Sequence, residues 1–333
     1  MIKSYPAPKP YRKSLQGDRA RGAAMAAKRL FLFFAAMAFG GLSCLALNDG
    51  QLRFENYLYA QISEPIRQIE YEIPQKPLRP ELDLDAKAAL SLRIGASGRE
   101  RVIYKDRENE ILPIASITKL MTAAVVYDNP SIYNMDRPVV ISRASAWQDD
   151  VPVYGNLKVG QIYTVRELLN LMLFYSSNDA AFALAEVAGS DKFIDAMNEK
   201  ARILGLESTV FYNPSGLDGA GGNVNFSTAA DLLKLSRYLL ESHSEIFSLT
   251  IDPVTSLTEN GLFAVNLWDG QALVGGKTGF TEKAGGCMIY IFENENHRRY
   301  INILLGSASS EARVAQMQKL VNYVNNTDRP TNQ

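Results

Sequence analysis

The chain has 333 residues, of which 47% are hydrophobic, and its formal net charge at pH 7 is −1. This length allows one large or two small domains with a substantial buried core. The near-neutral charge argues against nucleic acid as a partner, because nucleic-acid-binding proteins carry a basic patch. The two cysteines, Cys44 and Cys287, form no Cys-x-x-Cys pair, and the two histidines, His243 and His297, leave little basis for a zinc site. We therefore expect no metal and no cofactor.

The N-terminal region resembles a membrane-targeting segment. Residues 1–29 are rich in lysine and arginine, and residues 30–47, LFLFFAAMAFGGLSCLAL, carry no charge. An apolar run of this length lies at the lower edge of a membrane span, and the positive charge before it predicts a cytoplasmic basic segment and an exported remainder. The sequence thus predicts a transmembrane signal-anchor or a signal peptide over 30–47. The retained anchor is the favoured interpretation, ahead of cleavage near Ala46 and of a lipoprotein processed at Cys44.

The next segment differs in composition from the rest of the chain. Residues 48–80 end in a proline-rich stretch that favours extended chain, which indicates an extracytoplasmic stem. A globular domain is expected over 81–326, and a polar tail over 327–333.

Hydrophobic periodicity predicts the elements of this domain. The alternating segment AALSLRI predicts a strand over 88–94, and RVIYKD predicts its hairpin partner over 101–106. Apolar spacing of i, i+3 and i+4 predicts helices over 116–127, 165–175 and 180–187, and a further helix that starts with Ser227 as its N-cap.

The C-terminal part is richer in β structure. Short apolar runs predict strands over 274–280, 287–292 and 299–306, and a last helix is expected over 309–324. Strands at both ends of the domain with helices between them predict an α+β fold, in which one antiparallel sheet joins the two ends.

The first candidate motif is Ser116-Ile-Thr-Lys119, at the start of an apolar helical run. Positions i and i+3 of a helix share one face, so the two side chains can come within hydrogen-bond reach. The free N–H groups and the positive end of a helix N-terminus suit an oxygen that becomes acylated. By itself this short pattern is weak, because it arises by chance in a chain of this composition.

Two further motifs follow in the chain. Ser176-Ser177-Asn178 interrupts an apolar helical pattern, which favours a turn between two helices with a capping residue. Lys277-Thr278-Gly279 follows two glycines in a β context, where glycine often marks close approach of a backbone or a ligand. Each motif alone is compatible with a purely structural role.

The three motifs together resemble the penicillin-recognising serine acyltransferases, which carry them in this order. From about Asp83 to Val324 the sequence is similar to the D-alanyl-D-alanine carboxypeptidase family of low-molecular-mass penicillin-binding proteins. The segments that carry this resemblance are LPIASITKLMTA, TVRELLNLML followed by SSNDAA, FYNPSGLDG, FSTAADLLKL, GGKTGFTEKAGGC and LLGSASSEAR. The resemblance implies a β-lactamase/transpeptidase-like fold, with an antiparallel sheet flanked by helices and an all-helical subdomain.

The resemblance also implies roles for the first two motifs. Ser116 would be the acylated nucleophile and Lys119 its general base. Ser176 would relay a proton toward the leaving amine, and the Asn178 amide would hold a backbone group of the substrate.

The third motif and the last helix would bind the rest of the substrate. Lys277 and Thr278 would face the terminal carboxylate, with Arg313 as a second cation. Gly279 would leave room for the substrate along the strand edge. The backbone N–H groups of Ser116 and Phe280 would form the oxyanion hole.

The activity implied is removal of the terminal D-alanine from a peptidoglycan stem peptide that ends in D-Ala-D-Ala, with β-lactams as covalent inhibitors. The resemblance and the N-terminal segment together imply a bacterial cell-membrane protein whose catalytic domain lies on the periplasmic side. A DD-endopeptidase that cleaves cross-links would use the same groups and remains an alternative. A β-lactamase is less favoured, because Glu167 and Asn170 precede the Ser-x-Asn motif instead of following it. An inactive peptidoglycan-binding homologue is also less favoured, because all motif residues are present.

The remaining titratable residues are expected to be structural. We expect His243 and His297 at the surface, Glu167 on an exposed helix face, Asp179 as a cap of the following helix, and Cys287 as a small core residue.

Overall fold

The structure is a computed structural model of the chain, and it describes residues 25, 28–35, 37, 82–148, 156–219, 222–251 and 271–328. The chain divides into two compact units, Met1–Leu78 and Arg79–Gln333.

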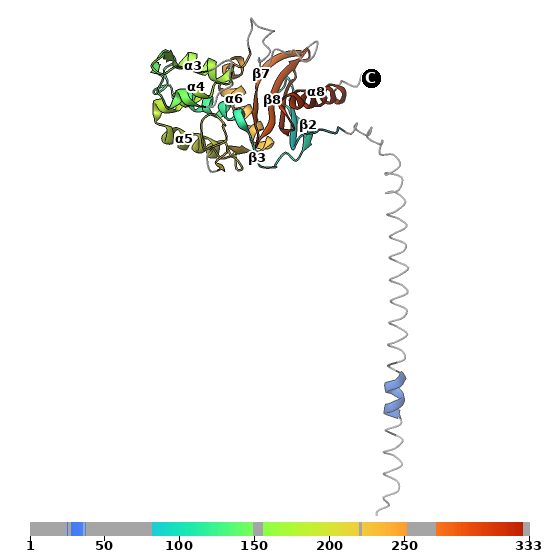
Figure 1. Cartoon of the computed structure of the whole chain (residues 1–333). Helices are drawn as coiled ribbons and strands as arrows, with labels where there is room; N and C mark the ends of the chain where they lie inside the picture. Colours follow the sequence, from blue (N-terminus) through green and yellow to red (C-terminus); the bar gives the residue numbers. More distant parts are fainter. Residues whose placement is uncertain are drawn as a thin grey trace, which may run out of the picture. The chain divides into compact units, whose positions relative to one another are not determined.

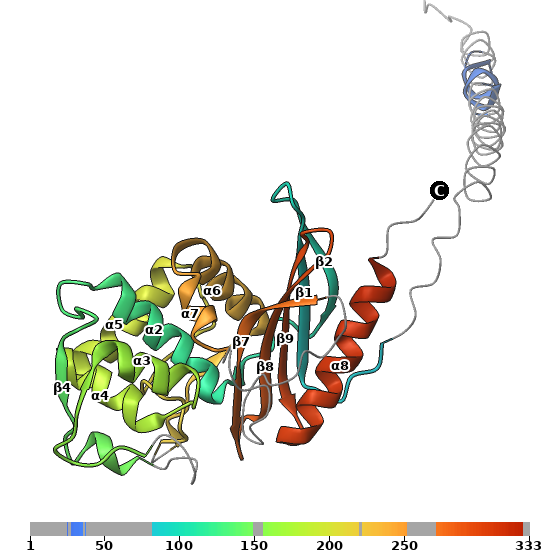
Figure 2. The same cartoon turned by 90° about the horizontal axis from the view of Figure 1, so that it is seen from above.

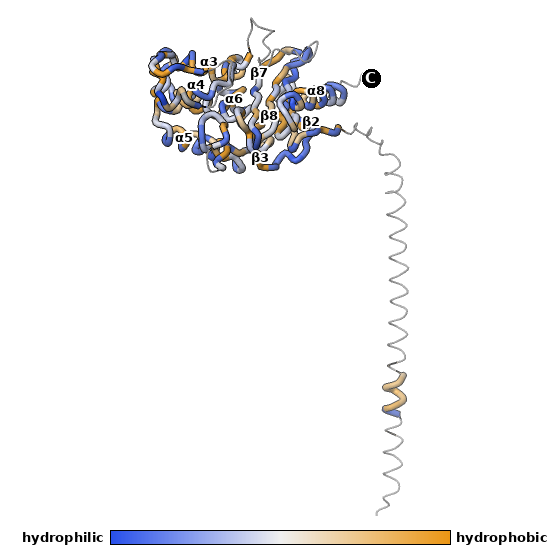
Figure 3. The backbone as a smooth tube through the Cα atoms, viewed as in Figure 1, coloured by the Kyte–Doolittle hydropathy of each residue, from blue (hydrophilic) through white to orange (hydrophobic). Residues whose placement is uncertain are grey.

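In the first unit, the described residues are helical, and Figure 3 shows the apolar character of this helical stretch. No helix among the described residues is both long enough and apolar enough to cross a membrane. Most of the expected segment 30–47 and all of the expected stem 48–80 lie outside the described residues.

The second unit, which Figure 1 shows as strands and helices, is built on a five-stranded antiparallel sheet. The strand order is β2-β1-β9-β8-β7 (Figure 2). These strands are β1 (Ala88–Ile94), β2 (Glu100–Asp106), β7 (Gln271–Thr281), β8 (Gly285–Asn294) and β9 (Arg299–Ser307). The first two strands pair with the last three through β1 and β9, so the sheet joins the two ends of the domain as expected.

Both faces of this sheet are covered at β8 and β9, which explains the nearly continuous apolar runs of these two strands. In β8, Ile289 and Ile291 belong to the core that lies under the helices of one face, whereas Tyr290 and Phe292 belong to a second core. The second core also contains apolar residues of α8 (Ser310–Thr327), and Figure 2 shows α8 on the opposite side of the sheet from the other helices. A strand that is buried on both faces loses the apolar/polar alternation of a half-exposed strand.

The helices of the other face lie between the two sets of strands in the sequence. They are α2 (Lys119–Asp128), α3 (Val165–Leu173), α4 (Asn178–Ala188), α5 (Ser190–Ile203), α6 (Ala229–Ser242) and the short α7 (Glu245–Ser248). Two 3₁₀ turns, η1 (Ala115–Thr118) and η2 (Ser145–Trp147), and two small ribbons complete the described part. The ribbons pair β3 (Leu112–Pro113) with β6 (Phe226–Ser227) and β4 (Pro138–Val140) with β5 (Ile162–Thr164).

The observed helix caps differ from two expectations. The N-cap of α6 is Thr228, whose hydroxyl accepts from Asp231 N, whereas Ser227 belongs to β6. The N-cap of α4 is Ser177, so the helix begins before Asp179. The Asp179 carboxylate instead accepts backbone N–H groups of Gln148 (3.2 Å) and Leu157 (2.9 Å). A buried carboxylate needs such donors, and here two loop segments supply them.

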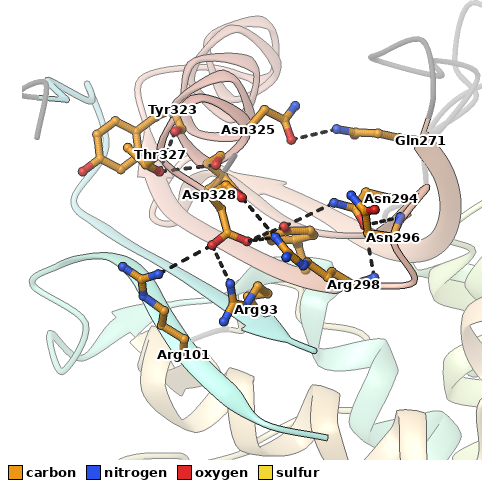
Figure 4. A network of polar contacts seen from close by, with 12 residues as sticks. Arg93, Arg101, Gln271, Asn294, Asn296, Arg298, Tyr323, Asn325, Thr327 and Asp328 are labelled. Atoms are coloured by element: carbon orange, nitrogen blue, oxygen red, sulfur yellow. Dashed lines mark hydrogen bonds and ion pairs between the residues drawn. The ribbon is translucent and has the colours of Figure 1, made fainter. Parts of the chain in front are cut away.

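The C-terminal end of α8 is tied to the sheet by an ionic cluster (Figure 4). The Asp328 carboxylate contacts Arg93 at 2.6 Å, Arg298 at 3.4 Å and Arg101 at 3.7 Å, and it accepts from Tyr300 Oη at 2.6 Å. α8 extends through Thr327, and Asp328, which follows it, is buried.

Candidate active site

Ser116 lies in η1, and Lys119 is the first residue of α2. The sequence predicted one helix from Ser116, but the first turn is 3₁₀ and is entered through Ala115 with φ of +46°. Ser116 is half-buried, whereas Lys119 is fully buried. A fully buried lysine requires hydrogen-bond partners for its amine.

The amine of Lys119 has such partners on three sides. Nζ donates to Ser116 Oγ at 2.8 Å, to Asn178 Oδ1 at 2.6 Å and to the backbone oxygen of Ser215 at 2.9 Å. The two predicted residues Ser116 and Asn178 are therefore both in direct contact with Lys119. Ser215 was not assigned to the site from the sequence.

The Ser-x-Asn motif forms the predicted turn between α3 and α4. Ser176 has φ of +62°, a left-handed conformation that a non-glycine residue rarely adopts. Ser177 caps α4 through a 3.0 Å bond from Ala180 N, and its own N–H donates to Leu171 O at 3.1 Å. These bonds hold the turn on both sides, so that Asn178 can contact Lys119.

Lys277 connects this turn to the sheet. It is fully buried in β7, and its Nζ donates to Ser176 Oγ at 2.8 Å and to Thr278 O at 3.1 Å. Burial, followed by the positive charges of Lys119 and Arg313, lowers the pKa of Lys277 well below its ordinary value. Within the described part of the chain, no carboxylate forms an ion pair with Lys277, so an anionic ligand would supply the missing counter-charge.

Gly279 allows β7 to lie against η1. A Cβ placed there would come within 2.9 Å of both Ile114 O and Ser116 N. Real Cβ atoms rarely approach a backbone atom this closely, so any larger residue would push the strand away from Ser116. The absence of a side chain at Gly279 therefore allows the strand to lie next to Ser116.

The other predicted residues of this edge lie around Gly279. Thr278 is buried, and the Phe280 side chain is 46% exposed. Arg313 Nη1 donates to Gly279 O at 2.9 Å, so the guanidinium of this α8 residue contacts the backbone of β7. Opposite Gly279 on β8 is Cys287, a buried residue as expected, and burial raises the pKa of its thiol to about 11.

The predicted site residues therefore come together from η1, α2, the Ser-x-Asn turn, β7 and α8. Hydrogen bonds link Ser116, Lys119 and Asn178 in one group and Ser176 and Lys277 in another. The two groups meet at the Ser-x-Asn turn, since that turn supplies one residue to each. No cluster of His, Cys, Asp or Glu in the described ranges could hold a metal ion.

The two histidines lie outside this arrangement. His297 is exposed in the β8–β9 turn, as expected. The surface expectation for His243 is wrong, because its Nε2 lies 2.8 Å from Asp128 Oδ1 in a partly buried cluster with Lys200 and Tyr238. Burial acts to raise the pKa of Asp128, but hydrogen bonds from Lys200, Tyr238 and His243 outweigh it and leave this pKa below its ordinary value.

Glu167 is not part of either hydrogen-bonded group and instead bonds with Thr164. Its carboxylate accepts from Thr164 N at 2.7 Å, and Glu167 N donates to Thr164 Oγ1, which forms a capping box at the start of α3. Glu167 is exposed, as expected, and a capping role gives no support to a β-lactamase that would use it as a second base.

Comparison with known proteins identifies the family of the chain. A sequence profile of the D-alanyl-D-alanine carboxypeptidase family matches residues 74–309. The chain is 33% identical over 264 residues to D-alanyl-D-alanine carboxypeptidase DacD of Salmonella typhimurium, covering 74% of this chain and 64% of that relative. It is 36% identical over 202 residues to a D-alanyl-D-alanine endopeptidase of Pseudomonas aeruginosa, covering 57% of this chain and 62% of that relative. The chain thus spans somewhat less than two thirds of the length of these curated relatives.

Solved structures of the same class have the same fold. Penicillin-binding protein D2 from Listeria monocytogenes, in a cefotaxime-bound form, matches with a TM-score of 0.62 and 32% identity, covering 73% of this chain and 98% of that one. A D-alanyl-D-alanine carboxypeptidase from Mycobacterium tuberculosis matches with a TM-score of 0.62 and 28% identity, covering 75% and 94%. The expected α+β fold of the β-lactamase/transpeptidase type is confirmed. By its sequence profile and its fold, the chain belongs to the D-alanyl-D-alanine carboxypeptidase family.

Proposed function

We propose that this protein is a serine-type D-Ala-D-Ala carboxypeptidase, which removes the terminal D-alanine from peptidoglycan stem pentapeptides through an acyl-enzyme on Ser116. The observation that carries the proposal is the 2.8 Å contact between the buried amine of Lys119 and the Ser116 hydroxyl, with Lys277 as a second buried ammonium nearby. Family membership supports the same reaction class.

In the acylation step, neutral Lys119 takes the proton of the Ser116 hydroxyl as the oxygen attacks the carbonyl carbon of the penultimate D-alanine. An ordinary lysine has a pKa of ~10.4, so a neutral amine at pH 7 costs about 4.6 kcal/mol. Lys119 is fully buried, and its charge is one of the causes that lower the pKa of the neighbouring Lys277. Burial and a nearby positive charge both disfavour the charged form of an amine. A base whose proton affinity approaches the working pH is the most effective in general base catalysis.

The substrate carboxylate would complete the electrostatics of the site. Lys277 Nζ donates to Thr278 O and Arg313 Nη1 donates to Gly279 O, so two basic side chains lie at the edge formed by Thr278 and Gly279. Lys277 has no carboxylate partner among the described residues, and a bound carboxylate would favour its charged form. A peptide that ends in a free carboxylate would thus be preferred over one with a blocked end. The 2.8 Å bond from Lys277 to Ser176 supports a proton path from Ser176 toward the leaving amine.

The tetrahedral oxyanion would be held by the backbone N–H groups of Ser116 and Phe280. The close approach of β7 to Ser116 N at Gly279 supports this assignment. Loss of one such donor typically costs a factor of about 10²–10³ in rate. Water then hydrolyses the ester, and the shortened peptide and free D-alanine are the products.

A DD-endopeptidase is the second candidate, because three of the curated relatives bear that name, including the one from Pseudomonas aeruginosa. Both activities cleave a D-Ala-D-amino acid bond and need the same nucleophile and base. Incubation with purified cross-linked dimers and with pentapeptide monomers, followed by chromatography of the products, separates them. Loss of dimers without release of D-alanine from monomers would favour the endopeptidase.

We further propose that residues 30–47 anchor the protein in the bacterial cell membrane, with the catalytic domain on the periplasmic side and residues 48–80 as a spacer. The uncharged run that follows a basic segment supports this orientation. Fractionation of cells, with protease added to spheroplasts, tests it: the domain should be degraded from outside. Protection of the domain would contradict the proposal.

The catalytic proposal is tested with the full chain purified in detergent. Mass spectrometry after incubation with a penicillin should show one covalent adduct on Ser116, and Ser116→Ala should show none. A peptide ending in D-Ala-D-Ala should then release free D-alanine, which a coupled assay measures, and Lys119→Ala should abolish the release. A wild-type chain that forms no adduct would be a peptidoglycan-binding homologue without activity.

A further inference from the structure

We propose that Asn213 is a positioning residue, which sets the direction of the Lys119 lone pair by fixing the backbone carbonyl of Ser215. The proposal rests on the proposed function, because it assigns a role within the same acylation step. It concerns the segment 213–217, Asn-Pro-Ser-Gly-Leu, which lies outside the three motifs.

The Asn213 side chain organises this segment from within. Its Oδ1 accepts from Ser215 N at 3.1 Å, Ser215 Oγ at 3.2 Å and Gly216 N at 2.7 Å, and its Nδ2 donates to Leu217 O at 2.9 Å. One amide thus uses both its donor and its acceptor capacity on the residues that come after it in the chain. The direction of the Ser215 carbonyl depends on this turn.

The segment is pressed against the turn that carries the nucleophile. A Cβ on Gly216, which has φ of +88°, would come within 1.9 Å of Ala115 O. The next contact is made by Thr122 Oγ1, which donates to Pro214 O at 2.6 Å. The segment therefore has little freedom to shift as a whole, and its internal geometry decides where the Ser215 carbonyl points.

That carbonyl matters because of the geometry of a lysine amine. An ammonium has three N–H groups, and those of Lys119 point at Ser116 Oγ, Asn178 Oδ1 and Ser215 O. After one proton has left, two N–H groups remain, and the lone pair takes the third direction. If Asn178 and Ser215 keep the two N–H groups, the lone pair faces the hydroxyl that it must deprotonate.

Asn213→Ala should therefore have two separate effects. Without the fixed carbonyl the amine can rotate, and the acylation rate at its pH plateau should fall about tenfold to a hundredfold, the range expected for misplacement of a reacting group. The ammonium form also loses a well-placed acceptor, so the acidic limb of the rate profile should move about one unit to lower pH.

Asn213→Asp should shift that limb in the opposite direction. The carboxylate keeps an acceptor for the N–H groups of residues 215 and 216 but loses the donor to Leu217 O, and it adds a negative charge to the segment that contacts the Lys119 amine through Ser215 O. The charged form of Lys119 is then favoured, and the acidic limb should move to higher pH by about one unit. The positive charges of Lys119 and Arg313 both act on Lys277 of β7, so Lys277 and Arg313 belong to the same group of charges as Lys119, and Asp218 lies in the same loop as Asn213. All of these residues are the same in every variant.

The experiment measures the second-order rate of acylation by a fluorescent penicillin between pH 5 and pH 9, in the full chain and the two variants. Asn294→Ala is the matched control, because Asn294 Oδ1 likewise accepts two backbone N–H groups, those of Asn296 and Arg298, in the β8–β9 turn. It should leave the profile unchanged. Partial unfolding lowers the measured acylation rate but does not move the pH at which the acidic limb of the rate profile falls. It therefore cannot produce opposite shifts in the two Asn213 variants.

Limbs that coincide with the wild type in both variants, or shift in the same direction, would overturn the role of Asn213 while the acyl-enzyme stands. Absence of any adduct in the wild type would instead overturn the proposed function. Circular dichroism of each variant, together with the fraction of chains that a saturating penicillin labels, corrects every rate for folded protein.

Discussion

Asp328 offers a direct test of how the last helix is held to the sheet. Its carboxylate is only 3% exposed and forms two short contacts, with Arg93 and Tyr300, both at 2.6 Å. Hydrogen bonds to a charged group contribute about 1.5–3 kcal/mol each. Arg298 and the half-exposed Arg101 are more distant, at 3.4 and 3.7 Å, and such partly exposed pairs add less than about 1 kcal/mol.

We therefore expect Asp328→Ala to reduce the free energy of unfolding by about 3–5 kcal/mol, the range found when one partner of a buried ion pair is removed. In a domain of this size the melting temperature should fall by about 10 °C. Urea unfolding followed by circular dichroism measures the loss. Asp328→Asn should cost less, because an amide oxygen can still accept from Tyr300.

The control is Asp136→Ala, which removes an ion pair with Arg166 whose side chains are 84% and 60% exposed. That pair should contribute no more than about 0.5 kcal/mol. If Asp328→Ala were as stable as this control, the cluster at the end of α8 would contribute nothing, and the reasoning from burial and distance would be refuted.

Three further predictions concern the site and its supporting helices. Lys277→Gln should lower kcat/KM for a peptide with a free terminal carboxylate by at least about a hundredfold, and much less for the same peptide as an amide; equal losses would exclude carboxylate recognition. Gly279→Ala should slow acylation of Ser116 by about tenfold or more, since the new methyl group would push β7 away, and an unchanged rate would contradict that packing. Asp128 has a lowered pKa, so its contribution to stability is complete above the unfolded pKa of ~3.9 and is lost as the pH falls through the lower folded value. Urea unfolding at pH 7 and pH 2.5 measures this: the difference in free energy of unfolding between the wild type and Asp128→Asn should be smaller at pH 2.5. A difference that is the same at both pH values would argue against a stabilising role of the Asp128 cluster.

Local rules in the sequence determined much of the secondary structure. Alternation along 88–94 predicted β1, and the helical spacing along 165–175 predicted α3 to within two residues. The chemistry of the three motifs was indicated only by their occurrence together and in one order, because each motif alone is compatible with a purely structural role. Such periodic patterns depend only on residues that are close together in the sequence, so they can be recognised without the folded structure.

Competing local signals were harder to separate. Ser227 and Thr228 are both good caps, and the pairing of Ser227 with Leu112 in a small ribbon decided between them. Asp179 has the composition of a cap, but two loop N–H groups from residues distant in sequence use its carboxylate instead. His243 follows a helix in a polar stretch, and only the packing of three helices brings it to a carboxylate.

By itself, then, the amino-acid sequence indicated which groups are candidates for the chemistry, which segments form strands and helices, and the order in which they occur. Only the tertiary structure decided which of these groups meet: it placed Lys277 against Ser176, although 101 residues separate them, and gave Lys119 a third acceptor in Ser215. The physical reason is that a buried amine must find partners wherever the folded backbone offers an oxygen. Every residue carries a backbone carbonyl, so the residue type does not indicate where that carbonyl points. Its direction is known only from the folded structure.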